Sequence, residues 1–342
     1  MTSTGTRGFG IIGTGVIAAV HADALAALPG ARLAAVTDVN AEAATAFAAE
    51  RGGEAEPDLD ALLARDDVDV VCVCVPSGLH AEVGARAAKA GKHLVVEKPI
   101  DVTLEAADRL IETARSAGVA LTVISQHRFD AGLVEARRLL SEGALGRLVL
   151  GEASTKWYRS QAYYDSADWR GSWAMDGGSL LNQGVHYVDL LRWCMGPVAE
   201  VTAVCTTQAH RIEAEDTSLA IVRFASGAVG TILSSTAAFP GFPQRLEITG
   251  TKGTVTIEDG QMSRRAFGDG GRPPGGAHLP SQAAADPAAL DVCGHAAQIA
   301  DLLAAIGEGR EPAVDGQAGR DALEIVCAVY ESSRSGRTVT LR

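Results

Sequence analysis

The sequence has no excess of basic residues and no basic run. Its 342 residues include 30 Lys and Arg against 42 Asp and Glu, which gives a formal net charge of −12. Binding to nucleic acid requires clustered Lys and Arg that displace counterions from the phosphate backbone. We therefore expect no nucleic-acid partner. Aromatic residues are also scarce, at 5%, whereas 47% of the chain is hydrophobic, a composition typical of globular proteins.

Long hydrophobic runs are missing as well. No segment approaches the roughly 20 apolar residues that a membrane-spanning helix needs. Residues 1–8 are small and polar, and glycine soon interrupts the apolar run that follows, which is unlike a signal peptide. We expect a soluble, cytoplasmic protein with no membrane partner.

Closely paired cysteines are lacking too. The six cysteines are scattered, and none forms a CxxC pair. Cys72 and Cys74 alternate within an apolar run and are expected to point to one side of a buried strand. We interpret them as small core residues and expect neither a disulfide framework nor a metal site.

What the sequence does contain, in its first third, is an alternation of short apolar runs and helical patterns. The apolar runs predict buried strands at 9–12, 32–37, 68–75, 93–96 and 119–125. The helical patterns lie between them, at 16–28, 41–51, 80–90 and 103–116. Repetition of strand, helix and strand predicts a parallel sheet covered by helices on both faces.

The pattern changes near Ser125. A helix at 132–140, a strand at 147–157 and a helix at 178–195 precede strands at 198–208, 217–224, 228–235, 244–250 and 253–258. A surface loop at 264–287 and helices at 290–308 and 319–335 complete the chain. Consecutive strands with short turns predict an antiparallel sheet. We therefore predict an α/β protein with two domains. Residues 1–124 form a Rossmann domain with a doubly wound parallel sheet, and residues 125–342 form an α+β domain with an open, mainly antiparallel sheet.

A glycine-rich turn, residues 10–18, ends the first predicted strand and opens the first predicted helix. Gly13 allows the tight turn, Gly15 lets the backbone approach a pyrophosphate, and Ala18 replaces a third glycine so that helix and strand pack closely. The first N–H groups of the helix favour a diphosphate. We predict that five consecutive residues hold a dinucleotide: Gly13, Thr14, Gly15, Val16 and Ile17.

Asp38 follows the second predicted strand, a little over twenty residues after the glycines. A carboxylate at this place accepts hydrogen bonds from the adenosine ribose and repels a 2′-phosphate. No Arg follows it directly, so the sequence favours NAD over NADP. The alternative is that Asp38 only caps the next helix.

The sequence Glu97-Lys98-Pro99 directly follows the predicted strand at 93–96. Ligands of open α/β sheets bind beyond the carboxyl ends of the strands, so Lys98 is expected at the edge of the cofactor site. Its ammonium group can hydrogen-bond a substrate hydroxyl and stabilise developing alkoxide charge. The alternative is a solvated surface lysine.

A glycine-flanked segment, 177–189, carries Asn182 and His186. If the helix begins at Gly178, these two residues lie one turn apart and share a face. The imidazole of His186 is suited to take a hydroxyl proton near neutral pH. Gly184 between them is expected to permit close approach of a ring or substrate. The alternative, a histidine that only packs, is disfavoured by the surrounding glycines.

Together these segments resemble the Gfo/Idh/MocA family, which includes glucose–fructose oxidoreductase and inositol 2-dehydrogenase. The likeness covers essentially the whole chain and rests on residues 13–18, 75–80, 97–99 and 178–189. It implies a Rossmann domain followed by a domain whose open sheet commonly forms dimers or tetramers through its exposed face.

The resemblance also implies roles for particular residues. Lys98 matches the catalytic lysine of the family and His186 its catalytic histidine. Asn182 departs from the inositol-dehydrogenase pattern, in which an Asp precedes the histidine by one turn. An amide can orient a substrate but cannot take a full proton, so whether His186 or Lys98 is the base stays open. Four residues match positions near the nicotinamide half: Pro76, Ser77, His80 and Glu97.

Amphipathic side chains precede the same helix: Arg159, Tyr163, Tyr164, Trp169 and Arg170. Aromatic faces stack on the C–H groups of a sugar ring, while Arg and Tyr bind its hydroxyls. We predict that these side chains bind substrate, with the alternative that Trp169 and Arg170 contact the cofactor.

The sequence thus predicts an NAD-dependent oxidoreductase that transfers hydride at a secondary hydroxyl carbon of a sugar, sugar derivative or cyclitol. We assign catalysis to Lys98, Asn182 and His186, which also bind the substrate, and we expect a homodimer or homotetramer. Three alternatives stay open. They are an NAD-dependent glycosidase or lyase that uses transient oxidation, a non-catalytic dinucleotide sensor, and an enzyme acting on a non-carbohydrate alcohol or an imine.

Overall fold

The computed structural model describes residues 5–268 and 292–341. The chain divides into two compact units. The first lies within Met1–Gln126 and Leu290–Arg320, and the second lies within His127–Ala289 and Asp321–Arg342. No helix in the described ranges is both long and apolar enough to cross a membrane.

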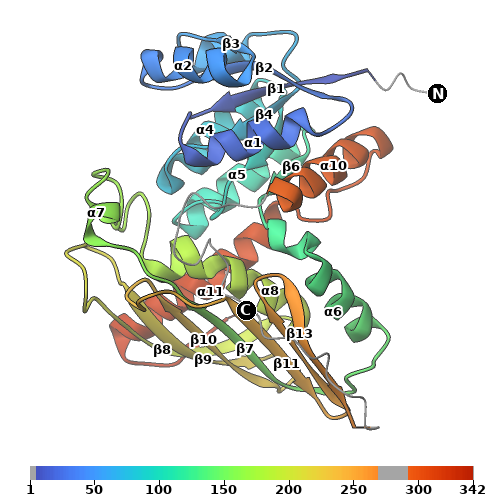
Figure 1. Cartoon of the computed structure of the whole chain (residues 1–342), viewed down its shortest axis with the longest axis vertical. Helices are drawn as coiled ribbons and strands as arrows, with labels where there is room; N and C mark the ends of the chain where they lie inside the picture. The colour runs from blue at the N-terminus through green and yellow to red at the C-terminus, as the bar shows by residue number, and fades with distance from the viewer. Residues whose placement is uncertain (1–4, 269–291, 342) are drawn as a thin grey trace. The chain divides into compact units, whose positions relative to one another are not determined.

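The sheet of the first unit has the order of a doubly wound Rossmann fold (Figure 1). Its strands are β1 (Arg7–Ile12), β2 (Ala31–Thr37), β3 (Glu54–Ala55), β4 (Val70–Val73), β5 (His93–Val96) and β6 (Leu121–Val123). They pair in parallel in the order β3-β2-β1-β4-β5-β6. The predicted parallel sheet is confirmed.

The helices of this unit begin and end at residues with clear local reasons. They are α1 (Val16–Ala26), α2 (Ala41–Arg51), α3 (Leu59–Leu63), the 3₁₀ turn η1 (Ser77–Leu79), α4 (His80–Lys89), α5 (Leu104–Ala117) and α10 (Val292–Glu308). The Asn40 side chain accepts the first N–H groups of α2, and the Thr103 side chain does so for α5. Gly118, at φ 67°, ends α5 in the left-handed conformation that favours glycine.

Helix α10 is a correction to the predicted domain boundary. The sequence analysis placed residues 290–308 in the second domain, but α10 packs against α1 in the first unit. Its Ile299 and Leu302 are fully buried in one core with Phe9 and Ile11 of β1. An amphipathic helix must bury its apolar stripe, but the stripe alone does not say against which sheet.

The second unit contains a larger, mixed sheet. Its strands are β7 (Leu148–Lys156), β8 (Val198–Thr206), β9 (Thr217–Phe224), β10 (Val229–Ser235), β11 (Arg245–Gly250), β12 (Gly253–Glu258), β13 (Gln261–Phe267) and β14 (Val339–Thr340). They lie in the order β13-β12-β11-β7-β10-β9-β8-β14. The pair β7–β10 is parallel and the other pairs are antiparallel, which confirms the predicted mainly antiparallel sheet.

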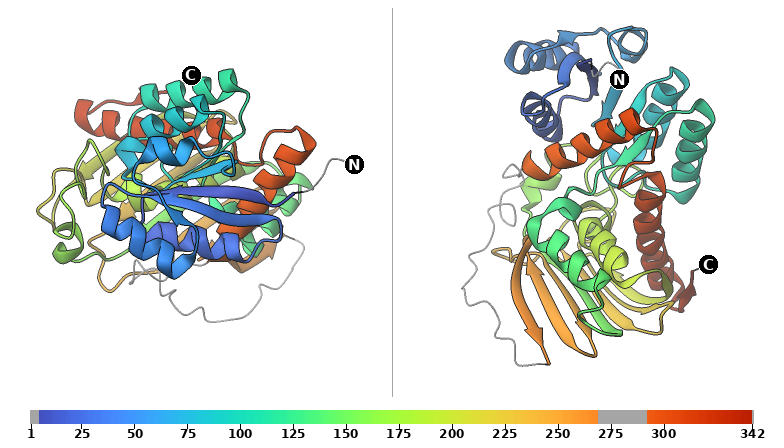
Figure 2. Two further views of the ribbon diagram at one scale, coloured as in Figure 1. Left: turned by 90° about the horizontal axis from the view of Figure 1, so that it is seen from above. Right: turned by 90° about the vertical axis from the view of Figure 1, so that its right-hand side faces the viewer.

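Helices cover one face of this sheet. Those that pack against it are α6 (Ala131–Ser141), the π-helical η3 (Leu180–Gly184) and α8 (Val185–Met195). The unit also contains α7 (Gln161–Tyr164) and most of η2 (Gln126–Phe129) and of α11 (Gly316–Ser335), inside which a unit boundary falls. Figure 2 shows α6 and α8 on one face, whereas the opposite face carries no helix of the described residues. The packing is close, because a Cβ on Gly151 of β7 would lie 2.8 Å from Leu191 of α8.

The short elements β3, α3, β13 and β14 are not predicted by the sequence patterns. Residues 264–267 belong to β13, so the predicted loop at 264–287 was wrong at its start. They form the edge strand that pairs with β12, despite their two arginines. The rest of that predicted loop, residues 269–287, lies outside the described residues. So do the first two positions, 290 and 291, of the helix predicted at 290–308.

Candidate functional site

The glycine turn between β1 and α1 is shaped to receive a phosphate group. Gly13 has φ +88°, and a Cβ there would lie 2.5 Å from the carbonyl oxygen of Cys74. A Cβ at Gly15 would meet nothing within 4 Å, so the backbone is open to a ligand at this point. No side chain caps the start of α1, and its first turn has no acidic residue. Its first N–H groups therefore suit an anion.

Asp38 lies directly beside this turn. Its Oδ2 accepts hydrogen bonds from Thr14 N at 2.7 Å and Thr14 Oγ1 at 2.9 Å, and its Oδ1 accepts from Asn40 N. The cap of α2 is Asn40, so the interpretation of Asp38 as a mere helix cap is wrong. The carboxylate stands at the carboxyl end of β2, where a Rossmann fold receives a ribose.

The turn after β5 carries Lys98, whose side chain is half-buried and whose bond to Pro99 is cis. The neighbouring loop is held against this turn by His80, which is fully buried. Its Nδ1 lies 2.7 Å from the Pro99 carbonyl oxygen, and its Nε2 lies 2.9 Å from that of Val75. Burial lowers the pKa of His80. Both ring nitrogens of His80 thus face main-chain carbonyl oxygens, so His80 joins the loop after β4 to the turn that carries Lys98.

Glu97 and Ser77 are also buried, and Pro76 is half-buried. Glu97 Oε2 accepts the Lys98 N–H at 3.1 Å, and Glu97 Oε1 lies 2.7 Å from His21 Nε2. Its carboxylate is therefore engaged by the protein itself.

Asn182 and His186 lie where a π-helical segment passes into a regular helix. Asn182 belongs to η3 and His186 to α8. Both are half-buried. The predicted helix from Gly178 thus begins at Leu180 with a wider turn, and π-turns of this kind are frequent at functional sites. The His186 ring packs edge-on against His127, with the ring centroids 5.2 Å apart.

The glycines around His186 have packing reasons. A Cβ on Gly184 would lie 2.8 Å from Ser234 Oγ of β10, and one on Gly178 would lie 2.2 Å from the carbonyl oxygen of Glu215. The expectation that Gly184 makes room for a ring or substrate is therefore wrong. The space beside it is filled by the sheet.

Asp176 is a buried carboxylate that the sequence analysis missed. Its Oδ2 accepts the Gly171 N–H at 2.7 Å, and its Oδ1 accepts a hydrogen bond from Asn182 Nδ2. The amide of Asn182 is thereby oriented, with its Nδ2 directed to Asp176. A carboxylate is therefore present next to position 182, although the sequence has an amide at that position.

Glu215 is a second buried carboxyl group that the sequence analysis missed. Its Oε1 accepts hydrogen bonds from Leu180 N at 2.9 Å and from Tyr330 Oη at 2.8 Å. Burial raises the pKa of Glu215 to about 8, although the bond from Leu180 opposes the shift. Glu215 thus supports the start of the helical segment that carries Asn182 and His186.

The loop before this segment gathers arginine and aromatic side chains. The Arg170 guanidinium lies over the rings of Tyr163 and Trp169, 4.4 Å from each centroid, and its Nη1 donates to Tyr163 Oη at 2.8 Å. The guanidinium of the buried Arg159 also lies 5.6 Å from the centroid of the Tyr163 ring. Tyr164 is turned inward, where its hydroxyl bonds Thr236 Oγ1. The Tyr164 hydroxyl is thus engaged by the protein itself.

The predicted residues are divided between the two units. Gly13, Thr14, Gly15, Asp38, His80 and Lys98 belong to the first unit, and Arg159, Tyr163, Trp169, Arg170, Asn182 and His186 belong to the second. Cys72 and Cys74 are free and buried in the first core, where burial raises their pKa values. The described residues hold one set of metal-ligand type that the sequence analysis did not foresee, namely His21, Glu97 and His295.

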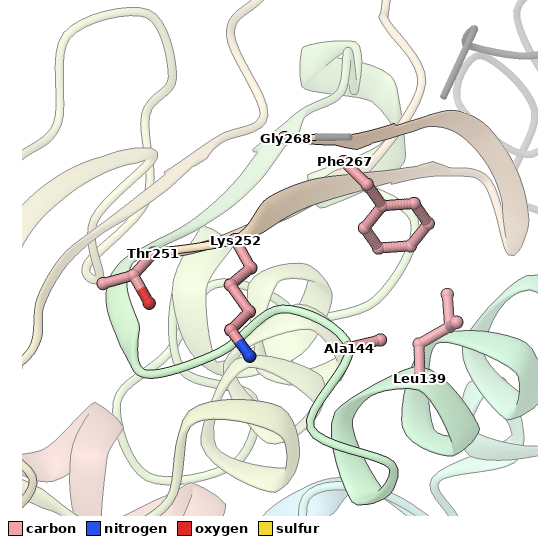
Figure 3. Close-up of a pocket in the computed structure, with 6 residues that line it drawn as sticks. All are labelled: Leu139, Ala144, Thr251, Lys252, Phe267 and Gly268. Atoms are coloured by element: carbon pink, nitrogen blue, oxygen red, sulfur yellow. The ribbon is translucent and has the colours of Figure 1, made fainter. Parts of the chain in front are cut away.

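A hollow of about 630 Å³ in the second unit lies elsewhere (Figure 3). Leu139 of α6 and Phe267 of β13 point toward one another across it. None of the predicted site residues lines it.

Comparison with known proteins agrees with this geometry. Residues 7–125 match the profile of an oxidoreductase family with an NAD-binding Rossmann fold, and residues 133–256 match the Gfo/Idh/MocA C-terminal domain. Inositol 2-dehydrogenase of Rhizobium meliloti is 30% identical over 97% of this chain and 98% of its own length. The chain belongs to the Gfo/Idh/MocA family. The predicted resemblance is confirmed, and this Gfo/Idh/MocA protein is an NAD-binding oxidoreductase.

Two other Gfo/Idh/MocA-like proteins are informative. The WlbA dehydrogenase of Bordetella pertussis, solved in complex with NADH and UDP-GlcNAcA, is 33% identical with a TM-score of 0.87, and the match covers 99% of each chain. The 2,7-anhydro-N-acetylneuraminate hydratase of Mediterraneibacter gnavus is 30% identical over 74% of this chain and 67% of its own.

Proposed function

We propose that this oxidoreductase transfers hydride between NAD and a secondary hydroxyl carbon of a sugar, sugar derivative or cyclitol. One observation carries the cofactor part, namely the uncapped start of α1 with open space at Gly15 and a carboxylate, Asp38, beside it. These groups fit a dinucleotide diphosphate and an unphosphorylated ribose. The dinucleotide, when bound, supplies the hydride acceptor.

The protein's own groups would act on the hydroxyl. The Lys98 ammonium donates a hydrogen bond to the hydroxyl oxygen and stabilises the negative charge that develops on it. His186 takes the hydroxyl proton, a step for which a neutral imidazole is suited. Asn182, whose Nδ2 is directed to Asp176, orients a substrate hydroxyl through its amide. Tyr163, Trp169 and Arg170 offer stacking faces and donors to a sugar ring.

A substrate screen tests the proposal. NADH formation should appear with one or more compounds among inositols, free aldoses, aminosugars, nucleotide-linked sugar acids and glycosides. The regiochemistry of the product then identifies the oxidised carbon. Absence of turnover with every class, in protein that binds NADH, would favour a non-catalytic dinucleotide sensor.

One alternative has a specific observation in its favour, the similarity to a hydratase. Such chemistry on this scaffold would oxidise the sugar transiently and return the hydride. It would give product without net NADH, and the enzyme would retain its cofactor through turnover. Product formation without absorbance at 340 nm would therefore select this alternative.

Cofactor choice is expected to depend on the charge of Asp38. Asp38→Asn keeps an acceptor for Thr14 but removes the charge that repels a 2′-phosphate, so NADPH binding should tighten about tenfold, as expected for roughly 1.4 kcal/mol. Asp38→Ala should in addition weaken NADH binding. Fluorescence titration with both cofactors measures this. A wild-type protein that already prefers NADPH would show that Asp38 has been misread.

Activity is expected to require one carboxylate and one amide at positions 176 and 182, in either order, and to fall when both positions carry a carboxylate. Asn182→Asp places two carboxylates in hydrogen-bond contact, where they cannot both ionise without repulsion, and should lower kcat about 100-fold. The double variant Asp176→Asn with Asn182→Asp restores one carboxylate and one amide and should recover most of this loss. Steady-state kinetics of the two variants decide the matter, and additive losses would contradict the pairing.

The uncovered sheet face is expected to form the homo-oligomer. Val204, Leu219 and Ile221 are 67%, 51% and 63% exposed, and Leu219 is the direct cross-strand neighbour of Val204. A contiguous apolar surface of this kind marks an interface. Leu219→Glu with Ile221→Glu should give monomers in sedimentation velocity. Val134→Glu, which charges an equally exposed side chain on α6, should not.

A further inference from the structure

Three titratable side chains from distant parts of the chain meet in the interior of the first unit. His21 comes from α1, Glu97 follows β5, and His295 comes from α10. Their relative exposures are 0%, 4% and 1%. Burying a carboxylate away from water is costly unless it is paired. The free-energy cost of burying these groups suggests that the cluster has a specific role.

The contacts within the cluster centre on Glu97. His21 Nε2 lies 2.7 Å from Glu97 Oε1, and His295 Nε2 lies 3.5 Å from the same oxygen. The two imidazole rings pack edge-on, 5.3 Å apart. Burial alone raises the pKa of Glu97, but the hydrogen bond from His21 and the nearby ring of His295 outweigh burial and hold the pKa well below its usual range. Glu97 is thus an anion to which His21 donates.

The second carboxylate oxygen of Glu97 links the cluster to Lys98. Glu97 Oε2 accepts the main-chain N–H of Lys98 at 3.1 Å. A carboxylate that is fixed at Oε1 by an imidazole cannot rotate, so Oε2 fixes the backbone from which the Lys98 side chain leaves. The path runs from α1 through His21 and Glu97 to Lys98.

The distances favour a hydrogen-bonded cluster over a metal site. Nitrogen and oxygen ligands lie about 2.0–2.2 Å from Zn²⁺, so tetrahedral ligands are about 3.4 Å apart. The separation of 2.7 Å between His21 and Glu97 is instead that of a charge-assisted hydrogen bond. Within residues 5–268 and 292–341, Nδ1 of His21 has no hydrogen-bond partner, whereas a metal-bound imidazole almost always donates its other N–H.

We propose that His21 and Glu97, faced by His295, are positioning residues that fix the main chain at Lys98. The expected effect on turnover rests on the proposed catalytic role of Lys98. The fixed position of the Lys98 main chain does not, because amide exchange measures it without a substrate. His21 also belongs to the helix that opens with the glycine turn. The same side chain therefore couples the dinucleotide-binding helix to the lysine.

The test compares three variants in the full-length protein. His21→Leu removes the donor, His21→Gln keeps a donor at the place of Nε2, and His93→Leu is the control. His93 lies at the other end of β5, where its Nδ1 accepts from Ala120 N. Amide hydrogen exchange at Lys98, followed by NMR, should speed up at least about tenfold in His21→Leu, since the Lys98 N–H loses a fixed acceptor. It should stay near wild type in His21→Gln and His93→Leu.

Turnover is the second measurement. His21→Leu should lower kcat about 100-fold, because misplacing a catalytic group by about 1 Å has effects of that size, while NADH affinity stays close to wild type. His21→Gln should restore kcat. Should His21→Leu fail to fold, Glu97→Gln takes its place. This variant leaves no unpaired buried charge, but its single side-chain oxygen cannot accept hydrogen bonds from both His21 and the Lys98 N–H.

The outcomes separate the two proposals. Unchanged exchange at Lys98 in His21→Leu and Glu97→Gln overturns the positioning role, whatever the enzyme's substrate. Faster exchange in a protein that turns over no substrate supports the positioning role and counts against the proposed function. Thermal stabilisation by Zn²⁺ alone in wild type, lost in His21→Leu, would overturn the hydrogen-bonded account in favour of a metal site.

Discussion

Replacing Lys98 or His186 with alanine is expected to lower kcat by about 10²–10⁴-fold while NADH affinity stays near wild type. Removal of a donor that meets developing negative charge has effects of about 10²–10³, and removal of a general base has effects of about 10²–10⁴. Losses in kcat and in kcat/KM should be similar, because both groups are proposed to act on the transition state. Single-turnover rates and NADH titrations measure the two quantities separately.

Suitable controls are available in the same chain. Lys92→Ala removes a lysine whose ammonium group donates to the Arg65 carbonyl oxygen and has no part in the proposed step, so turnover should be unchanged. If Lys98 and His186 both serve the proposed step, their double variant should be little worse than the more damaged single variant. Near-normal turnover in that double variant would refute both assignments.

Much of the fold follows from local sequence patterns. The bounds predicted for α2, β5, β9 and β12 agree with those observed, because hydrophobic periodicity and turn residues report directly on these elements. The two-residue strands β3 and β14 carry too little sequence for any periodicity.

The site residues divide in the same way. The proximity of Gly13, Gly15 and Asp38 could be predicted because a fixed spacing at a strand-to-helix junction reflects one local geometry. Glu215 and the cluster around Glu97 were missed because tertiary structure brings their partners together. Glu215 meets Tyr330 across 115 positions, for example. No periodicity in the sequence reports such a contact.

The glycines near His186 show how a local argument can mislead. Their presence in a helix was interpreted as a sign of ligand approach. In the structure Gly178 makes room for Glu215 and Gly184 for Ser234. A glycine reports that something lies close by, but not whether it is a ligand or the protein itself.

The protonation of Glu215 is expected to make the free energy of unfolding depend strongly on pH. Burial raises its pKa from 4.5 to about 8 in the folded protein, so the folded state holds a proton that the unfolded state releases at neutral pH. This stabilising contribution is fully present below pH 4.5 and is lost as the pH rises through 8. At roughly 1.4 kcal/mol per pKa unit, it changes by several kcal/mol across that range.

Glu215→Gln should remove this dependence. Glutamine keeps an oxygen for the Leu180 N–H and the Tyr330 hydroxyl but has no proton to lose, so the variant should gain on wild type as the pH rises from 5 to 8. Free energies of unfolding from urea titrations at several pH values measure the difference. Glu213→Gln removes the same charge from an exposed neighbour and should leave the wild-type slope intact. Parallel curves for wild type and Glu215→Gln would mean that Glu215 is ionised in the folded protein, and that the N–H groups at the start of the helix outweigh its burial.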